Sequence, residues 1–531
     1  MKKQSRAIAW MLMVVVVLQW GPALDACTIL GIGKKATVDG STIVAHNDDS
    51  SVADFPLRIV PAADWPEGAK RKIVANAHTR EGGNVLGEMP QVRHTYRYFM
   101  SRYSFMNEKG VAITESTFGI DTSTDYGKKL RDVMYTKGDG LIDCWMAQDV
   151  ALERAATARE AVQVMGKLVD EFGFLTETGG GGEVMTITDG NETWVAEFYG
   201  GPIWAAVRIP DDHLFVGANR ARIGEINLAD KANVMASAKI VSFAVEQGWF
   251  DPKAGKPFVV NKTYAPDNGI GLTRREWRVI DLVAPSLKLP ANLEDYPFSV
   301  KPDKPLSVED VRKIQSDYYE GTPYDLTQGP AAGPWGDPIR YGNRGGKGAF
   351  ERAINTMRTY YLHIGQVKAS LPEPFRGTSW FGYGGPDTSY LTPLWPAMDE
   401  LPAHLGRGDR YGAFDRESGF WTNIYVQQMA ELHYNEAIKI VRAAREPRLS
   451  MLYALTPKVL DLAAQTYAKD PKAAINLITQ YGSANAVAWQ QDWLKLGDTL
   501  LGKYAMGMVD GHPTGYPQWW NELIGYKPLV R

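Results

Sequence analysis

Cys27 is the residue of this chain that is best suited to nucleophilic chemistry. The chain has 531 residues and 2 cysteines, Cys27 and Cys144. A cysteine at a free amino terminus carries its own base, because an α-amine with a pKa of about 8 can accept the thiol proton. The resulting thiolate is the nucleophile. Such a site needs no histidine, and none of the 8 histidines lies in a Cys/His motif. It needs a carboxylate that orients the amine and donors that hold a tetrahedral oxyanion.

The residues before Cys27 have the layout of a secretory signal peptide. Basic residues near the start precede an apolar run of 14 residues from Ala7 to Trp20, and a helix-breaking stretch then ends at Ala26. That order is typical of a secretory signal. The run is too short to span a bilayer, and no other segment approaches 18 consecutive apolar residues. We predict a signal peptide over 1–26, with or without a short propeptide. We expect an exported chain, periplasmic or extracellular, with no integral membrane span.

Two other roles for Cys27 stay open. An exported protein meets an oxidising compartment, so Cys27 could form a disulfide with Cys144. Alternatively, the residues Leu24-Asp25-Ala26 partly fit the sequence that precedes a lipid-modified cysteine. The chain would then be a lipid-anchored envelope protein that binds a ligand such as a sugar. A lipidated Cys27 has an acylated amine that cannot serve as a base, so the nucleophile and the anchor exclude each other.

The composition is that of a globular protein without a nucleic-acid partner. Hydrophobic residues make up 44% of the chain and charged residues 22%, which is close to the globular average. The 58 Lys and Arg residues face 61 Asp and Glu residues, for a net charge of -3. There is no basic excess to neutralise phosphates, so we expect no nucleic acid. No metal-spacing motif such as His-Glu-x-x-His occurs, and we expect neither a metal nor a cofactor.

An ordered set of motifs begins at Cys27. The chain opens there with Cys-Thr, continues to Asp-Gly-Ser-Thr at 39–42 and reaches Asn47-x-Asp49. Further segments follow in order at 106–117, 180–201, 207–223, 274–278 and 319–334. The set resembles the cysteine dipeptidases of the amino-terminal-nucleophile (Ntn) hydrolase superfamily, relatives of penicillin V acylase and bile salt hydrolase. The resemblance extends from about residue 27 to about residue 430.

The resemblance implies roles for particular residues. Cys27 matches the nucleophile, with its α-amine as the base, and Asp49 matches the aspartate that holds that amine. Asn219 matches the asparagine that helps to bind the oxyanion. A late arginine is also implied, and Arg275 and Arg278 both qualify. We assign Arg275 to catalysis and Arg278 to the substrate pocket, and the choice between them stays open.

Two more positions belong to the implied substrate and oxyanion pocket. Thr117 falls where relatives carry a polar residue on the oxyanion side. His46 departs from the family, because relatives commonly have Arg-Asn-x-Asp where this chain has His46-Asn47-Asp48-Asp49. Arginine is a fixed charge, whereas histidine is charged only when protonated. We therefore expect activity to fall as His46 loses its proton. For the Asp48–Asp49 pair itself, side chains that point apart in an extended chain favour a surface turn.

The resemblance also implies an α+β fold, a four-layer αββα sandwich with Cys27 at the end of the first strand and with two stacked antiparallel sheets. Apolar runs at Thr28–Gly33 and Thr42–Ala45 flank an Asp-Gly turn, which predicts a hairpin. This hairpin would return the segment from His46 to Asp49 to the amino terminus.

Helical patterns fill much of the rest of the chain. Trp145 to Phe172 has apolar positions at steps of three and four, which predicts one helix on a sheet face. Four amphipathic helices are expected at 425–443, 457–468, 471–481 and 484–505. We predict a catalytic domain over 27–427 and a helical carboxyl-terminal extension over 428–531 that packs on the core without a site of its own.

These inferences favour an exported cysteine peptidase that hydrolyses dipeptides through an acyl-enzyme on Cys27. Its expected partners are small peptide substrates, and a homo-oligomer stays open. The nearest alternative is an acylase that acts on non-peptide amides with the same machinery.

Overall fold

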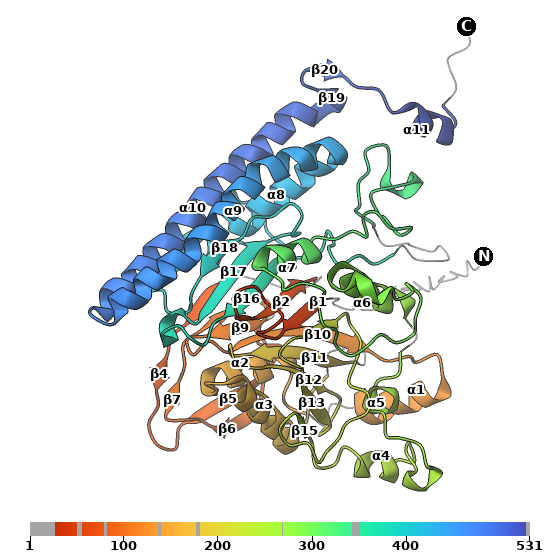
Figure 1. The fold of residues 1–531 in the computed structure, drawn as a ribbon, viewed down its shortest axis with the longest axis vertical. Coiled ribbons are helices and arrows are strands. Elements are labelled where there is room, and N and C mark those ends of the chain that lie inside the picture. Colours follow the sequence, from red (N-terminus) through yellow and green to blue (C-terminus); the bar gives the residue numbers. More distant parts are fainter. Residues whose placement is uncertain are drawn as a thin grey trace, which may run out of the picture.

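The computed structural model describes residues 27–49, 56–78, 82–135, 140–176, 181–267, 269–341 and 351–526. The predicted signal peptide, residues 1–26, lies outside these ranges. Two large sheets lie at the centre of the molecule, and helices lie on both sides of them (Figure 1). The expected α+β class is confirmed, including a helical carboxyl-terminal stretch.

The first large sheet contains the amino-terminal hairpin. Its strand order is β14-β1-β2-β16-β17-β18, and all neighbours are antiparallel. The strands are β1 (Thr28–Ile32), β2 (Thr42–Asp48), β14 (Leu214–Gly217), β16 (Tyr361–Val367), β17 (Gly377–Tyr383) and β18 (Thr392–Leu394). Strands β1 and β2 pair with Thr28 opposite Asn47. This register confirms the predicted hairpin and places the end of β2 beside Cys27.

The second large sheet has the order β15-β13-β12-β11-β10-β9-β8-β3 and is also antiparallel throughout. Its strands are β3 (Arg58–Val60), β8 (Tyr98–Met100), β9 (Ser104–Asn107), β10 (Ala112–Gly119), β11 (Gly181–Thr188), β12 (Thr193–Phe198), β13 (Trp204–Arg208) and β15 (Val234–Ala236). The segment at 180–201, which is part of the resemblance, supplies the two strands β11 and β12.

The two sheets meet through small and hydroxyl side chains of their central strands. Thr186 on β11 donates a hydrogen bond to the backbone oxygen of Leu30 on β1, over 3.1 Å. A Cβ atom at Gly31 would lie 3.2 Å from the methyl carbon of Thr186, which is tighter than ordinary packing. The absence of a side chain at position 31 thus allows the backbones to approach closely. The hairpin that follows Cys27 is held directly against the second sheet.

Two helices cover the outer face of the second sheet, α2 (Cys144–Arg154) and α3 (Ala158–Phe172). The single helix predicted over Trp145–Phe172 is wrong, because the chain leaves helical geometry at Ala155. Thr157 then caps the second helix, and its side chain accepts a hydrogen bond from the backbone N–H of Glu160. A threonine at this position satisfies a backbone donor that would otherwise lack a partner, so it starts a new helix.

Helices α8 (Gly419–Glu431), α9 (Tyr434–Tyr467) and α10 (Pro471–Tyr504) pack on the outer face of the first sheet (Figure 1). The four shorter helices predicted here are wrong in number and length. The two expected at 471–481 and 484–505 form one helix, and α9 continues through Pro447 and Pro457. An interior proline costs a helix about 3 kcal/mol, but burial of a long face against the core compensates for it.

The remaining elements are shorter and surround the two sheets. The helices are α1 (Asp125–Leu130) with a π-helical turn at Arg131–Tyr135, α4 (Ser242–Glu246), α5 (Val260–Tyr264), α6 (Ile270–Val283), α7 (Val308–Gln315) and α11 (Gln518–Leu523). The paired short strands are β4 (Ala63–Asp64) with β7 (His94–Thr95), β5 (Lys70–Ala75) with β6 (Asn84–Pro90), and β19 (Met508–Val509) with β20 (His512–Pro513). Within the described ranges, no helix combines the length and the apolar character that crossing a membrane requires.

The central strand β16 makes the fold sensitive to acid. His363 on β16 is fully buried, and burial lowers its pKa from 6.5 to about 3. Between these values the unfolded chain binds a proton that the folded chain does not, so stability falls as the pH falls. At about pH 5 this one side chain lowers the free energy of unfolding by about 2 kcal/mol relative to about pH 7. We expect a His363→Met variant to lose about that much less stability between these pH values, as measured by urea unfolding. An unchanged pH dependence would contradict this assignment.

Candidate active site

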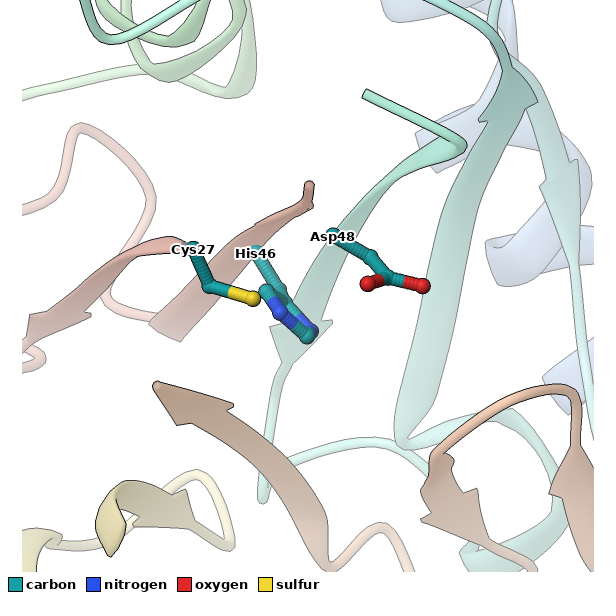
Figure 2. Close-up of side chains that lie close together, drawn as sticks. All are labelled: Cys27, His46 and Asp48. Carbon is teal, nitrogen blue, oxygen red and sulfur yellow. The ribbon is translucent and has the colours of Figure 1, made fainter. Parts of the chain in front are cut away.

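Cys27, His46 and Asp48 lie together on the face of the hairpin that meets the second sheet (Figure 2). Side chains alternate along a strand, so His46 and Asp48 of β2 share one face. All three side chains are buried, and their sulfur, nitrogen and oxygen atoms lie within 4.8 Å of one another. The surface turn predicted for Asp48 and Asp49 is wrong. Strand β2 continues through Asp48, and both carboxylates are buried.

The thiol of Cys27 lies among carboxylates. It donates a hydrogen bond to Oε1 of Glu115 on β10, over 3.5 Å. Burial, followed by the charges of Glu115, Asp48 and Asp49, raises the pKa of the Cys27 thiol well above 9.0, although a hydrogen bond from the backbone of Asp49 lowers it. A group that ionises to an anion is disfavoured in an apolar and negatively charged setting. In this environment Cys27 is a thiol at neutral pH.

His46 is a neutral residue in this setting. Its ring contacts Tyr103 at a tilt and Tyr361 edge-on, with centroid distances of 5.7 Å to each. Burial, together with His363 and Arg102, lowers the pKa of His46 well below 6.5. A protonated His46 that substitutes for the family arginine is therefore disfavoured, because the surrounding interior excludes its charge.

Asp49 is held by residues that are distant in sequence. Its Oδ2 forms an ion pair with Nη2 of Arg352 at 2.6 Å, and its Oδ1 accepts a hydrogen bond from Thr359 over 2.5 Å. Burial raises the pKa of Asp49, while Arg352, Thr359 and Arg275 lower it. Arg352 and Thr359 thus favour the ionised carboxylate at the position where the sequence predicts a partner for the α-amine.

Asn219 adopts a left-handed backbone conformation, with a φ of 61°. Its backbone N–H donates to Oγ of Ser116 over 3.1 Å, and its side-chain amide donates to the backbone oxygen of Thr117 over 2.7 Å. Ser116 in turn donates to the backbone oxygen of Cys27 over 3.4 Å. The hydroxyl of Thr117 donates to Glu183 over 3.0 Å. Asn219 and β10 therefore approach Cys27 from the same side.

Arg275 on α6 joins Asn219 to Cys27. Its Nη1 donates to the backbone oxygen of Cys27 over 2.7 Å, and its Nη2 donates to Oδ1 of Asn219 over 2.8 Å. Burial, followed by the charge of Arg352, lowers the pKa of Arg275 to about 10, so it stays protonated at neutral pH.

Arg278 has different partners, one turn further along α6. It forms a bidentate pair with Asp317, with distances of 2.9 and 2.8 Å, and a further contact with Asp281. The structure therefore brings Arg275 to Cys27 and does not bring Arg278 into this group.

Cys144 takes no part in the site. It is the first residue of α2 and is buried in the core beneath that helix. Cys27 and Cys144 are not joined to each other, so the disulfide that was left open between them is not formed.

Sequence reasoning missed several residues of the site. Glu115 and Ser116 lie in the 106–117 segment that carries the resemblance, but only Thr117 was assigned a role there. Arg352 is 303 residues from Asp49, and no local motif marks it or Thr359. Only the pairing of β16 with β2 reveals them, because Thr359 lies just before the strand that follows β2 in the sheet.

The arrangement combines a thiol with hydrogen-bond donors, guanidinium groups and a buried carboxylate that pairs with one of them. A thiol attacks a carbonyl carbon once a base removes its proton, and donors near the attacked oxygen stabilise the charge that develops there. The site is therefore suited to acyl transfer from an amide.

The chain matches the model of peptidase family C69 over residues 26–446. It is 30% identical over 440 residues to a probable dipeptidase of Latilactobacillus sakei, covering 77% of this chain and 82% of that protein. A probable dipeptidase of Salmonella dublin is 29% identical over 412 residues, covering 76% of this chain and 87% of the relative. A dipeptidase of Bifidobacterium longum is 25% identical over 465 residues, covering 79% and 80%. The match includes Cys27 and all the groups that surround it, and the chain belongs to peptidase family C69.

Proposed function

We propose that Cys27 is the amino-terminal nucleophile of this protein, which is a cysteine-type dipeptidase. The observation that carries the proposal is the match to peptidase family C69 across the whole segment that builds the site. Relatives that align over most of their own length are named dipeptidases, which supports dipeptides as the substrate class. An acylase that acts on non-peptide amides would use the same groups, but no relative named here points to it.

In the proposed reaction, the α-amine of Cys27 takes the thiol proton and the sulfur attacks the scissile carbonyl carbon. A C–S bond forms, and the carbonyl oxygen becomes an oxyanion that Asn219 and backbone donors stabilise. Collapse of this intermediate breaks the C–N bond, and the amine gives its proton to the departing amino group. Water that the same amine deprotonates then hydrolyses the thioester and restores the thiol.

The charges around Cys27 explain why cleavage before this residue would activate it. While Cys27 is joined to Ala26, its nitrogen is an amide that cannot take a proton, and three carboxylates disfavour the thiolate. Cleavage would free an amine that is both a base and, once protonated, a positive charge beside the sulfur. Asp49, whose negative charge the ion pair with Arg352 favours, would orient that amine.

We extend the proposal to architecture and location. The two sheets with their outer helices would form the four-layer αββα sandwich of an Ntn hydrolase. Residues 27–427 would form the catalytic domain and 428–531 a helical extension, which α8 joins to the core. Residues 1–26 would direct export to the periplasm or the extracellular space before removal.

The first test is the intact mass and the amino-terminal sequence of the exported protein, for wild type and a Cys27→Ala variant. We expect the wild type to begin with an unmodified Cys27 and to hydrolyse dipeptides faster than N-acyl amides. The variant should lose more than about a thousandfold in kcat/KM, because removal of a nucleophile removes covalent catalysis. A mass increase of lipid size on Cys27 would refute the mechanism and favour the anchored binding protein.

The second test compares thiol reactivity before and after cleavage, in a Cys144→Ser background that leaves one cysteine. In a form that retains Ala26, the raised pKa of Cys27 should confine alkylation by iodoacetamide to alkaline pH. At about pH 7 we expect the cleaved form to react at least about tenfold faster. Equal rates at that pH would show that the free amine does not activate the thiol.

The third test addresses Arg352, which sequence motifs do not reveal. In an Arg352→Gln variant the pKa of Asp49 should rise, since a charge that lowers it is lost. The acidic limb of the profile of kcat/KM against pH should then move to higher pH, and the value near neutrality should fall by about tenfold. The matched control is Arg416→Gln, which removes an exposed ion pair with Asp498. A profile that stays in place would remove Arg352 from the mechanism.

A further inference from the structure

Cys27 and three side chains around it form a set of metal-donor atoms. Cys27, His46 and Asp48 each offer one donor atom, and these atoms lie within 4.8 Å of one another. Glu115 adds a carboxylate oxygen that is 3.5 Å from Sγ of Cys27 and 3.4 Å from Nε2 of His46. The four residues come from the start of β1, from β2 and from β10, and all are buried. Figure 2 shows the thiol beside the imidazole, with Asp48 further along the same strand.

Two of the distances between these atoms match edges of a tetrahedral metal site. Zinc binds sulfur at about 2.3 Å and nitrogen or oxygen at about 2.0–2.2 Å, which places neighbouring ligands about 3.3–3.7 Å apart. The Sγ–Oε1 and Nε2–Oε1 distances of 3.5 and 3.4 Å fall within that range. A small cation could therefore contact Cys27, His46 and Glu115 without a large movement of the backbone.

His46 is the independent sign that this cluster is built to take a ligand. Its ring is 1% exposed, and within the described ranges its Nε2 atom has no hydrogen-bond partner. That atom lies 3.4 Å from Oε1 of Glu115 without forming a hydrogen bond to it. A buried nitrogen without a partner is unfavourable, and coordination of a cation by a neutral imidazole would satisfy it.

The donor types select among cations. A thiolate and an imidazole favour soft or borderline metals such as Zn²⁺ over Mg²⁺ or Ca²⁺, which prefer oxygen ligands. The carboxylates that disfavour a thiolate at Cys27 would favour a divalent cation in the same place. His46 is what makes metal binding possible at this position. An arginine, which relatives commonly carry here, would bring a positive charge and no lone pair to donate to a metal.

We propose that Cys27, His46 and Glu115, with Asp48 beside them, form a binding site for Zn²⁺ that reversibly blocks the thiol. On binding, a bond forms between Zn²⁺ and the sulfur, and the thiol proton leaves to solvent. The metal is an inhibitor in this proposal, and catalysis does not require it. The inhibitory part of the proposal rests on the proposed function, whereas the binding part does not.

The test uses the purified full-length protein after removal of metals with EDTA. Co²⁺, which takes the same geometry as Zn²⁺, should give an intense thiolate-to-cobalt charge-transfer band in the near ultraviolet, and Zn²⁺ should displace it. The absence of this band in the wild type, or X-ray absorption of the Zn²⁺ form that shows no sulfur ligand, would overturn the proposal.

Variants assign the ligands. Cys27→Ser should abolish the charge-transfer band, and His46→Gln should weaken Zn²⁺ binding at least about tenfold. The matched controls are Cys144→Ser and His404→Gln, which change a buried cysteine and a buried histidine outside the cluster and should keep the band. A band that persists in Cys27→Ser would place the metal elsewhere. Circular dichroism of each variant separates loss of binding from loss of the fold.

An assay of dipeptide hydrolysis distinguishes failure of the metal site from failure of the proposed function. We expect Zn²⁺ to inhibit dipeptide hydrolysis by the wild type and EDTA to restore that activity. The His46→Gln variant should need at least about tenfold more Zn²⁺ for the same inhibition. Hydrolysis that depends on Cys27 but shows no Zn²⁺ binding would overturn the metal site alone. Zn²⁺ binding without hydrolysis that depends on Cys27 would overturn the proposed function alone.

Discussion

The balance of charge around one buried sulfur atom is the constraint on which the rest of this structure depends. Glu115, Asp48 and Asp49 all raise the pKa of the Cys27 thiol, and each is itself buried. Buried carboxylates require positive charge or hydrogen bonds nearby, because water cannot solvate them. The two guanidinium groups of Arg275 and Arg352 provide these in part. The fold therefore brings both arginines to the hairpin, where they compensate part of this negative charge.

The fold meets this constraint by stacking two sheets so that several remote segments end at the same place. The hairpin contributes Cys27 and Asp49, β10 contributes Glu115, and the turn after β14 contributes Asn219. A left-handed φ of 61° at Asn219 is tolerated because both its backbone N–H and its side-chain amide are hydrogen-bonded to β10. Asparagine is one of the few side chains that adopts this conformation at low cost. This left-handed turn thus fixes the amide where Arg275 can reach both it and Cys27.

The sequence predicts contacts between residues that are close along the chain. It does not predict contacts between distant segments. The β1–β2 hairpin follows from two apolar runs around an Asp-Gly turn, and its register returns Asp49 to Cys27 as expected. The break between α2 and α3 depends on one capping threonine, and the length of α9 depends on packing that overrides two prolines. Arg352 could not be predicted, because its link to Asp49 spans 303 residues and arises only when β16 pairs with β2.

The histidine at position 46 shows that positive charge near Cys27 comes from distant segments and not from strand β2, which lies beside it. The surrounding interior keeps His46 neutral, so β2 contributes only negative charge, from Asp48 and Asp49, next to the thiol. The compensating charge comes from α6 and from the segment before β16. A cation that the strand itself lacks can then be supplied by the fold, by a protonated amine at Cys27 or by a bound metal. All three positive charges would lie close to Cys27 and would repel one another. Loss of one of them should therefore strengthen the binding or the protonation of the others.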